Sequence, residues 1–496
     1  MPATNPSPSK QKKRKSVAST NSKNQRIRKV AATNHKSKKR KPKKKPLKLW
    51  HWIMIWCGLT GVSIASATAG ALVAVSLSST PLRQTPIAPE ELTVFSQDEA
   101  IASQSLRLPE LTRPVNIMLL GTKVLTSDID DESYPDLGYH ALVNSFEGLS
   151  DTMLVLRFDP DREKMSVLSV PRDTQASIEG YGVGKINHAN SYGGAVLAAK
   201  SISNLLGGVE LDRYIRVNVQ GIEKLIDALG GVTVYVPKDM KYTDHSQHLY
   251  IDLKEGEQVL DGEKAMQFLR FRYDGYGDIG RVQRQQTLIR ALLEQALSPG
   301  NLVKLPQILS IVQSHIDTNL SVQELIALAG FASSVNRSDM QMVMLPGEFS
   351  GDGKDGNTSF WLPHHRKIGE VMAQHFDIGD LGDDGFAKEP SRVRIAIQDS
   401  TGDANAVRSM LDYLNSMGYQ RVTIADDWSE PLQSTRIIAQ GGDDLIAAEM
   451  RSSLGFGEVR VESTGVLSTD ITIQLGEDWV IMADTLEADP LETRLN

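Results

Sequence analysis

Residues 151–174 read DTMLVLRFDPDREKMSVLSVPRDT, and this stretch decides the fold. Two apolar runs are separated by DPDRE, a cluster of residues that favours turns. The pattern predicts two consecutive strands, with Asp151 where the first begins and Arg172 and Asp173 where the second ends. Polar side chains at strand ends are where open α/β sheets usually bind ligands.

The segments on either side of this hairpin alternate between strand and helix patterns. A further buried strand is predicted at 115–122 (VNIMLLGT), and AVLAAKSISNLLGG at 195–208 is typical of a helix that stops at glycine. Strand, helix and strand patterns follow up to residue 237. This alternation predicts a layered α/β domain over residues 115–350.

A second, smaller α/β domain is predicted at 392–484, after a connecting segment at 351–391 that ends acidic and glycine-rich, and before a tail at 485–496. Its first loop, QDSTGD at 398–403, fits the turns and caps that usually join a strand to a helix. No cluster of titratable residues resembles an active site there. We therefore interpret this domain as a recognition or packing module.

The amino-terminal part predicts a single membrane anchor. Residues 1–48 hold 18 of the 54 Lys and Arg residues and no Asp or Glu, and no charged residue lies between Leu49 and Leu82. Residues 49–78 are long enough for one transmembrane helix and too long for a cleaved signal peptide. The basic side should be cytoplasmic, which places the body outside the cell membrane after a stalk at 79–114.

The basic arm has two interpretations. Its Lys, Ser, Asn and Pro content predicts disorder, and clustered Lys and Arg beside a membrane helix usually set topology and contact anionic lipid. Nucleic-acid binding is the alternative, and it is less favoured because the folded domains are predicted to lie outside the cell.

Cysteine and histidine usage excludes several classes of protein. Cys57 is the only cysteine and lies in the predicted membrane segment, so the body has neither a disulfide framework nor a thiol nucleophile. The ten His residues show no HExxH spacing, and there is no P-loop and no GxSxG motif.

Arginine is concentrated at 269–286, which reads LRFRYDGYGDIGRVQRQQ. A guanidinium binds phosphate oxygens with two parallel hydrogen bonds, whereas a single arginine more often makes a surface ion pair. Several arginines at one place favour a multiply charged anion. Arg281 and Gln285 lie four residues apart, on one face of a predicted helix.

The motifs together resemble the LytR-CpsA-Psr family, and the carboxy-terminal domain resembles the LytR carboxy-terminal domain. The resemblance covers nearly all of 115–350 and about 392–478, in the family's order. The motifs that carry it are NIMLLGT, LSDTMLVLRFDP, LSVPRDT, GYGVGKINHANSYGG, VNVQGIEKLIDALGGVTVYVP and GDIGRVQRQQ. It implies an α/β domain with a central mixed sheet and a membrane-anchored phosphotransferase. Such an enzyme moves a glycopolymer from a polyprenyl-pyrophosphate carrier to peptidoglycan or another envelope glycan, forming a phosphodiester.

The resemblance also implies roles for individual residues. Asp151 would bind Mg²⁺, and Asp278 would be the base that accepts the acceptor's proton. Lys123 stands where the family usually has a second metal-binding Asp. Either Asp128, Asp130 or Asp131 would replace that ligand, or Lys123 would itself supply part of the cation's charge. The pyrophosphate would be held by Arg172, Lys185, Arg270, Arg272, Arg281 and Gln285, with Arg172 also catalytic.

Three alternative functions follow from the same residues. A polyprenyl pyrophosphatase would use water as the acceptor. A non-catalytic envelope adaptor would hold the lipid-linked glycan, which Lys123 favours and Arg172 disfavours. A transcription regulator rests on the basic arm alone, and the predicted membrane segment places it last.

Overall fold

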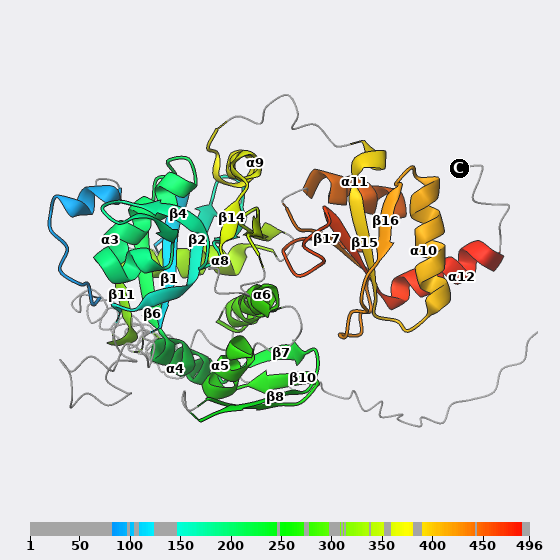
Figure 1. The fold of residues 1–496 in the computed structure, drawn as a ribbon, viewed down its shortest axis with the longest axis horizontal. Coiled ribbons are helices and arrows are strands. Elements are labelled where there is room, and N and C mark those ends of the chain that lie inside the picture. The colour runs from blue at the N-terminus through cyan, green and yellow to red at the C-terminus, as the bar shows by residue number, and fades with distance from the viewer. Residues whose placement is uncertain are drawn as a thin grey trace, which may run out of the picture. The chain divides into compact units, whose positions relative to one another are not determined.

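The computed structural model describes residues 82–488 with gaps (Figure 1). The gaps are 97–99, 104–108, 124–145, 246–248, 272–276, 297–307, 309–310, 312–313, 337–338, 352–358, 380–388 and 442–443. For residues 123, 249, 277–279 and 484–488 the backbone alone is described. The predicted arm at 1–48 and membrane helix at 49–78 lie outside the described residues. Among the residues that are described, no helix has the length and apolar character needed to cross a membrane.

A six-stranded mixed sheet forms the centre of the larger domain, as predicted. Strands β1 and β2 pair antiparallel, as do β2 and β3, whereas β6 runs parallel to β1 and β12 parallel to β3. Strand β11 closes one edge antiparallel to β6. In spatial order the strands are β11 (Ile316–Thr318), β6 (Arg213–Asn218), β1 (Val115–Lys123), β2 (Leu149–Asp159), β3 (Lys164–Ser169) and β12 (Met340–Met344).

Both faces of this sheet are buried, which explains the continuous apolar runs in its strands. Met118 and Met153 point to the face covered by helix α3 (His188–Leu205), where they pack with Ala199. Leu154 points to the opposite face and packs with Leu328 of helix α8 (Val322–Ser334). Successive side chains of a strand point to opposite faces, so each strand serves both layers.

Residues of helices α4, α5 and α6 and of strands β7 to β10 form a separate apolar cluster. Figure 1 shows helices α4 and α5 next to strands β7, β8 and β10. Helix α5 begins at Gly262 and is capped by Asp261, whose carboxylate accepts a hydrogen bond from the Lys264 backbone N–H. The elements here are α4 (Val219–Leu229), α5 (Gly262–Arg270), α6 (Gly277–Ala296), β7 (Val232–Val236), β8 (Met240–Asp244), β9 (Leu249–Leu253) and β10 (Gly256–Leu260).

Short elements complete the larger domain near the ends of β2 and β3. The hairpin β4–β5 follows β3 directly, and the β13–β14 pair joins it through a bridge between Thr174 and Trp361. Their bounds, with the remaining helices, are η1 (Glu91–Val94), β4 (Gln175–Ile178), β5 (Gly182–Lys185), β13 (Gly347–Phe349), β14 (Trp361–Pro363) and α9 (His365–Phe376).

Part of the segment expected as a stalk packs on this domain. Phe95 is buried with its ring 5.1 Å from that of Tyr214, and it bridges to Leu211. Ile101 is also fully buried. These scattered apolar residues have no periodicity, so their packing cannot be predicted from local sequence patterns.

The carboxy-terminal part is a second α/β unit around a five-stranded mixed sheet, with β17 antiparallel to β19 and the other pairs parallel. In spatial order the strands are β16 (Arg421–Ile424), β15 (Arg394–Asp399), β19 (Ile471–Leu475), β17 (Arg436–Ala439) and β18 (Glu458–Val461). The helices are η6 (Pro390–Arg392), α10 (Ala404–Ser416), α11 (Asp444–Leu454) and α12 (Glu477–Ala488). Asp399 accepts hydrogen bonds from Thr401 and Gly402, which gives the QDSTGD loop a structural explanation.

Candidate functional site

Asp151 occupies a β-bulge near the start of β2. Gly121 of β1 pairs with Thr152 and Thr122 pairs with Ser150, so Asp151 has no partner across the strands. A bulge bends its strand and re-aims the extra side chain. The Asp151 carboxylate is directed toward Arg172, which follows β3 at the same end of the sheet.

Arg172 connects two carboxylates. Its Nη1 lies 2.9 Å from Asp151 Oδ1, and its Nε lies 3.3 Å from Asp173 Oδ2. The side chain keeps 21% of its surface exposed, so the guanidinium remains accessible. The backbone around it is fixed because Asn187 N donates to Arg172 O at 3.3 Å and Thr174 N donates to Pro171 O at 3.0 Å.

Lys185, at the end of β5, extends the cationic group. Its Nζ donates to Asp173 Oδ1 at 2.7 Å and lies 5.9 Å from the centre of the Phe360 ring. Burial alone would raise the pKa of Asp173, but the Lys185 hydrogen bond and the charges of Arg172, Lys185 and Arg281 hold that pKa below its ordinary value. Asp173 is therefore ionised at neutral pH and orients both cations.

Asp151, Arg172 and Asp173 line a pocket, and helix α6 contributes Arg281 and Gln285 to it. Arg281 is buried, and the Gln285 amide Nε2 donates to Thr152 Oγ1 at 3.2 Å. Because the two residues are four apart, both face β2, as the predicted helix face required. Among the described side chains, three cations (Arg172, Lys185, Arg281) gather around Asp151 and Asp173, and a cluster of cations of this kind suits an anionic ligand.

The other wall of the pocket is apolar. Trp361 is placed beside Asp173 because its backbone N donates to Asp173 O at 2.9 Å, and its indole Nε1 donates to Leu345 O at 3.2 Å. Phe349 packs edge-on against it, with ring centres 5.0 Å apart. The apolar residues that line the pocket are Val170, Pro171, Val282, Met344, Phe349 and Trp361. Charge beside apolar surface fits a ligand with an ionic head and a hydrocarbon part.

Several residues expected near the pyrophosphate or the metal are not placed in this pocket. Arg270 ends α5, and its charge acts on Glu223 of α4, where it opposes the rise in pKa that burial of Glu223 causes. Arg272 lies outside the described residues. Asp278 lies in the first turn of α6 and Lys123 ends β1, but neither side chain is among those described. Asp128, Asp130 and Asp131 also lie outside the described residues.

The described residues could supply part of the ligand set of a metal ion. No group of three or more potential His, Cys, Asp or Glu ligands occurs among them. Mg²⁺ commonly takes one or two protein carboxylates and completes its shell with substrate phosphates and water. Asp151 provides one such carboxylate beside the cations, which fits Mg²⁺ brought together with a phosphorylated substrate.

Asp173 and Trp361 are site residues that the sequence did not assign. Asp173 was recognised as polar at a strand end, but its pairing with Lys185 depends on the β4–β5 hairpin. Trp361 reaches the pocket through β14, nearly 190 residues after β3. The sequence WLPHHRKIG around it carries no local signal of that contact.

A wider hollow of about 380 Å³ lies between η1 and α3. Its lining includes Lys200 and Glu179, which pair with each other at 2.8 Å. These charges neutralise one another, so this hollow does not show a cluster of cations like the one around Arg172.

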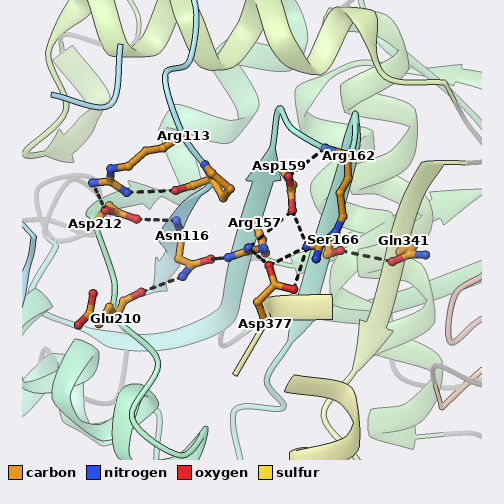
Figure 2. Close-up of polar contacts among 11 residues, drawn as sticks. Arg113, Asn116, Arg157, Asp159, Arg162, Ser166, Glu210, Asp212, Gln341 and Asp377 are labelled. Carbon is orange, nitrogen blue, oxygen red and sulfur yellow. Dashed lines mark hydrogen bonds and ion pairs between the residues drawn. The ribbon is translucent and has the colours of Figure 1, made fainter. Parts of the chain in front are cut away.

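A second charged cluster crosses the opposite end of the sheet (Figure 2). Asn116, Arg157, Ser166 and Gln341 are cross-strand neighbours on β1, β2, β3 and β12. Arg157 pairs with Asp377, just after α9, and Asp377 in turn pairs with Arg162 at 2.7 Å. Figure 2 shows these side chains converging on one another, and Asp159 forms an ion pair with Arg162. Its charges compensate each other, so we interpret the cluster as structural.

His375 of α9 joins this cluster and predicts a loss of stability in acid. Its Nδ1 lies 2.7 Å from Gln341 Oε1, and burial, with the charge of Lys164, lowers its pKa from 6.5 to about 4. Between these pH values the unfolded chain binds a proton that the folded chain does not. Stability should therefore fall by about 3 kcal/mol as pH drops from 6.5 to 4. Urea unfolding of His375→Gln, which keeps a donor, should show a correspondingly flatter pH dependence. Equal slopes for both proteins would contradict this assignment.

Comparison with known families covers most of the chain. The model of the LytR_cpsA_psr family matches residues 87–376, and a model described as LytR cell envelope-related transcriptional attenuator matches residues 392–479. The pocket around Arg172 lies within the first match.

Curated relatives match the first region. A protein of Oceanobacillus iheyensis named polyisoprenyl-teichoic acid–peptidoglycan teichoic acid transferase TagU is 35% identical over 221 residues, 43% of this chain and 61% of the relative. Bacillus subtilis TagV, named for the same activity, is 31% identical over 47% of this chain and 61% of its own length. The regulatory protein MsrR of Staphylococcus aureus is 37% identical over 34% of this chain and 51% of its length. The chain thus spans about three-fifths or less of these relatives.

Among solved structures, the crystal structure of Bacillus subtilis TagV aligns with 27% identity and a TM-score of 0.44. The alignment covers 54% of this chain and 99% of that one.

Proposed function

Because this chain belongs to the LytR-CpsA-Psr family, we propose that it is a membrane-anchored phosphotransferase acting on a polyprenyl-pyrophosphate-linked glycopolymer. The acceptor is a hydroxyl of peptidoglycan or another envelope glycan. The observation that supports this most is that the cationic side chains of Arg172, Lys185 and Arg281 gather beside an apolar wall. The two relatives named as teichoic acid transferases support the same chemistry.

In the proposed reaction, the acceptor oxygen attacks the phosphorus that bears the glycan. The bond from this phosphorus to the bridging oxygen breaks, and polyprenyl phosphate leaves with that oxygen. The acceptor proton passes to a base, for which Asp278 is proposed. Phosphoryl transfer depends mainly on positioning and on stabilising the charge on the phosphate oxygens.

The protein's own residues supply much of that stabilisation. Arg172 and Arg281 would bind the phosphate oxygens, and Gln285 would donate a further hydrogen bond. Asp173 keeps Arg172 and Lys185 oriented. We also propose that Arg270 and Arg272 join them when the donor binds, and that Asp151 holds Mg²⁺, which neutralises phosphate charge when bound. The apolar wall formed by Trp361 and Phe349 would take the first isoprene units.

The membrane anchor at 49–78 would keep the basic arm in the cytoplasm and the body outside, where both glycans are found. The carboxy-terminal unit has no proposed catalytic residue. Two alternatives remain as outcomes of the test: a pyrophosphatase that uses water, and an adaptor that binds the donor without reacting.

The test uses the full-length protein in detergent with a synthetic polyprenyl-pyrophosphate glycan, Mg²⁺ and soluble peptidoglycan fragments. Release of polyprenyl phosphate and formation of the glycan phosphodiester would be measured by mass spectrometry. Release that needs the acceptor supports the transferase. Equal release without acceptor would favour the pyrophosphatase, and donor binding without release would favour the adaptor.

Metal removal gives a separate prediction. Chelation with EDTA should lower the release rate by about a hundredfold, because charge-neutralising contacts at a phosphoryl group have effects of this order. Added Mg²⁺ should restore it. Asp151→Asn should need more Mg²⁺ for half-maximal rate, whereas Asp161→Asn, in the exposed turn after β2, should not. Full activity in EDTA would show that Lys123 and the arginines suffice without metal.

A further inference from the structure

Two tyrosines are stacked on the surface, one from the turn of the β4–β5 hairpin and one from helix α3. The rings of Tyr181 and Tyr192 lie 4.3 Å apart with an interplanar angle of 12°, and they keep 57% and 45% of their surface exposed. The ring of His188 packs 5.6 Å from that of Tyr192. We call these three residues the aromatic platform.

The local backbone presents both tyrosines outward. Tyr181 lies between Gly180 and Gly182, whose φ values of +81° and +80° are strained for other residues. Tyr192 is followed by Gly193 and Gly194, which interrupt the helical geometry of α3. Glycine loses more conformational entropy on folding than other residues, so these four glycines lower the local stability. In return they allow the backbone geometry that presents the two tyrosines outward.

Hydrogen bonds fix the rings in this arrangement. The Tyr192 hydroxyl lies 3.3 Å from His188 Nδ1, and the Tyr181 hydroxyl donates to Tyr192 O at 3.5 Å. A single exposed aromatic side chain is ordinary on a protein surface. A fixed, exposed pair is a preorganised binding surface, because its rotamers are already restricted before a ligand arrives.

One end of the platform lies near Arg172 along the chain. Tyr181 lies in the turn of the β4–β5 hairpin, at the end away from Lys185, and β4 packs on α3 (Figure 1). Asn187 donates its backbone N–H to Arg172 O at 3.3 Å and accepts from Ser150 N at 3.3 Å. His188 is the next residue, so the platform begins one residue from a contact of Arg172.

The chemistry of the platform selects its ligand. The rings are flat and uncharged, and the neighbouring charges of Lys200 and Glu179 neutralise each other. Such a surface fits the apolar C–H face of a pyranose ring, whereas a phosphate-rich chain is better matched by the cations around Arg172. The neutral partner in the proposed reaction is the sugar backbone of the acceptor.

We propose that Tyr181 and Tyr192 form a saccharide subsite that stacks a pyranose ring of the acceptor glycan strand and brings its hydroxyl to the pocket. This inference rests on the proposed function. The platform positions the acceptor and takes no part in bond breaking.

The first test measures binding of chitotetraose, a neutral β-linked N-acetylglucosamine oligomer, to the full-length protein in detergent by calorimetry. Tyr181→Ala and Tyr192→Ala should each weaken binding by about tenfold, in line with the energy of aromatic stacking. Tyr181→Phe keeps the ring and should retain binding within about threefold. Tyr250→Ala removes a comparably exposed tyrosine from β9 and should have no effect.

A donor assay separates failure of this inference from failure of the proposed function. Binding of the polyprenyl-pyrophosphate glycan should be unchanged in both alanine variants, while the KM for the peptidoglycan acceptor rises. If donor binding and transfer persist but neither alanine variant changes chitotetraose binding, the subsite is wrong and the function stands. If wild type does not bind the donor, the proposed function fails whatever the oligosaccharide does.

Tyrosine nitration distinguishes a saccharide from the membrane surface as the occupant. With the full-length protein in liposomes, both tyrosines should react with tetranitromethane and become protected when chitotetraose is added. Protection by the liposome alone, unchanged by the sugar, would overturn the inference in favour of membrane contact.

Discussion

Arg172→Ala should lower the rate of polyprenyl-phosphate release by about a thousandfold, because it removes a charged donor from the position where phosphate charge develops. The guanidinium of Arg172 contacts both Asp151 and Asp173. Its loss removes a phosphate contact and leaves both carboxylates less well compensated, which opposes binding of an anion. The rate of release, measured by mass spectrometry at saturating donor, is the relevant quantity.

Two matched variants sharpen this prediction. Arg172→Lys keeps the charge but loses the planar fork, so it should recover only part of the activity. Arg366→Ala removes an arginine that is 77% exposed on α9 and should be silent. The melting temperature of Arg172→Ala should stay near that of wild type, since the ion pairs it loses are partly solvated. An unchanged release rate would remove Arg172 from the reaction.

Much of the pocket was predictable because its residues lie at the ends of regular elements. Asp151 and Arg172 flank a hairpin whose strands are visible as apolar runs, and Arg281 and Gln285 share a helix face. The bulge at Asp151 was not predictable, because it depends on the register between β1 and β2 rather than on either strand alone.

The remaining features depend on pairings between distant segments. Strand β11 has three residues, which are too few for a periodic pattern to predict it. The parallel pairing of β12 with β3 brings Met344 to the pocket, and no short-range signal encodes it. Charged residues inside strands, such as Arg216, are usually interpreted as solvent-facing, yet this one is buried.

Asp317→Ala should destabilise the larger domain by about 3–5 kcal/mol, the cost of leaving a buried charge without its partner. Asp317 Oδ2 accepts from Arg216 Nε at 2.7 Å, and Asp317 Oδ1 accepts from Thr85 N at 2.6 Å. The two side chains keep only 0% and 4% of their surface exposed, so water cannot replace the lost carboxylate. Chemical unfolding followed by circular dichroism would measure the change.

A double variant separates the lost charge partner from the lost packing. Arg216→Met with Asp317→Leu removes both charges, and its stability should recover most of the loss, since buried ion pairs are often replaceable by apolar groups. A double variant as unstable as Asp317→Ala would show that the other hydrogen bonds, such as that to Thr85, carry the energy.

The same pair should also affect the pocket indirectly. Arg216 Nη1 lies 3.3 Å from Asn190 Oδ1, and Asn190 Nδ2 donates to the backbone oxygens of Phe146 and Gly148 at 2.9 and 2.7 Å. These bonds hold the segment that leads into β2 and Asp151. Folded Asp317→Ala should therefore bind Mg²⁺ at Asp151 more weakly, so that it needs more Mg²⁺ for half-maximal rate. Its KM for the donor should also be higher. Arg216 does not line the pocket. The double variant should therefore regain most of its stability while its KM for the donor stays raised. Lost transfer with unchanged stability in Asp317→Ala would instead assign this pair to the substrate.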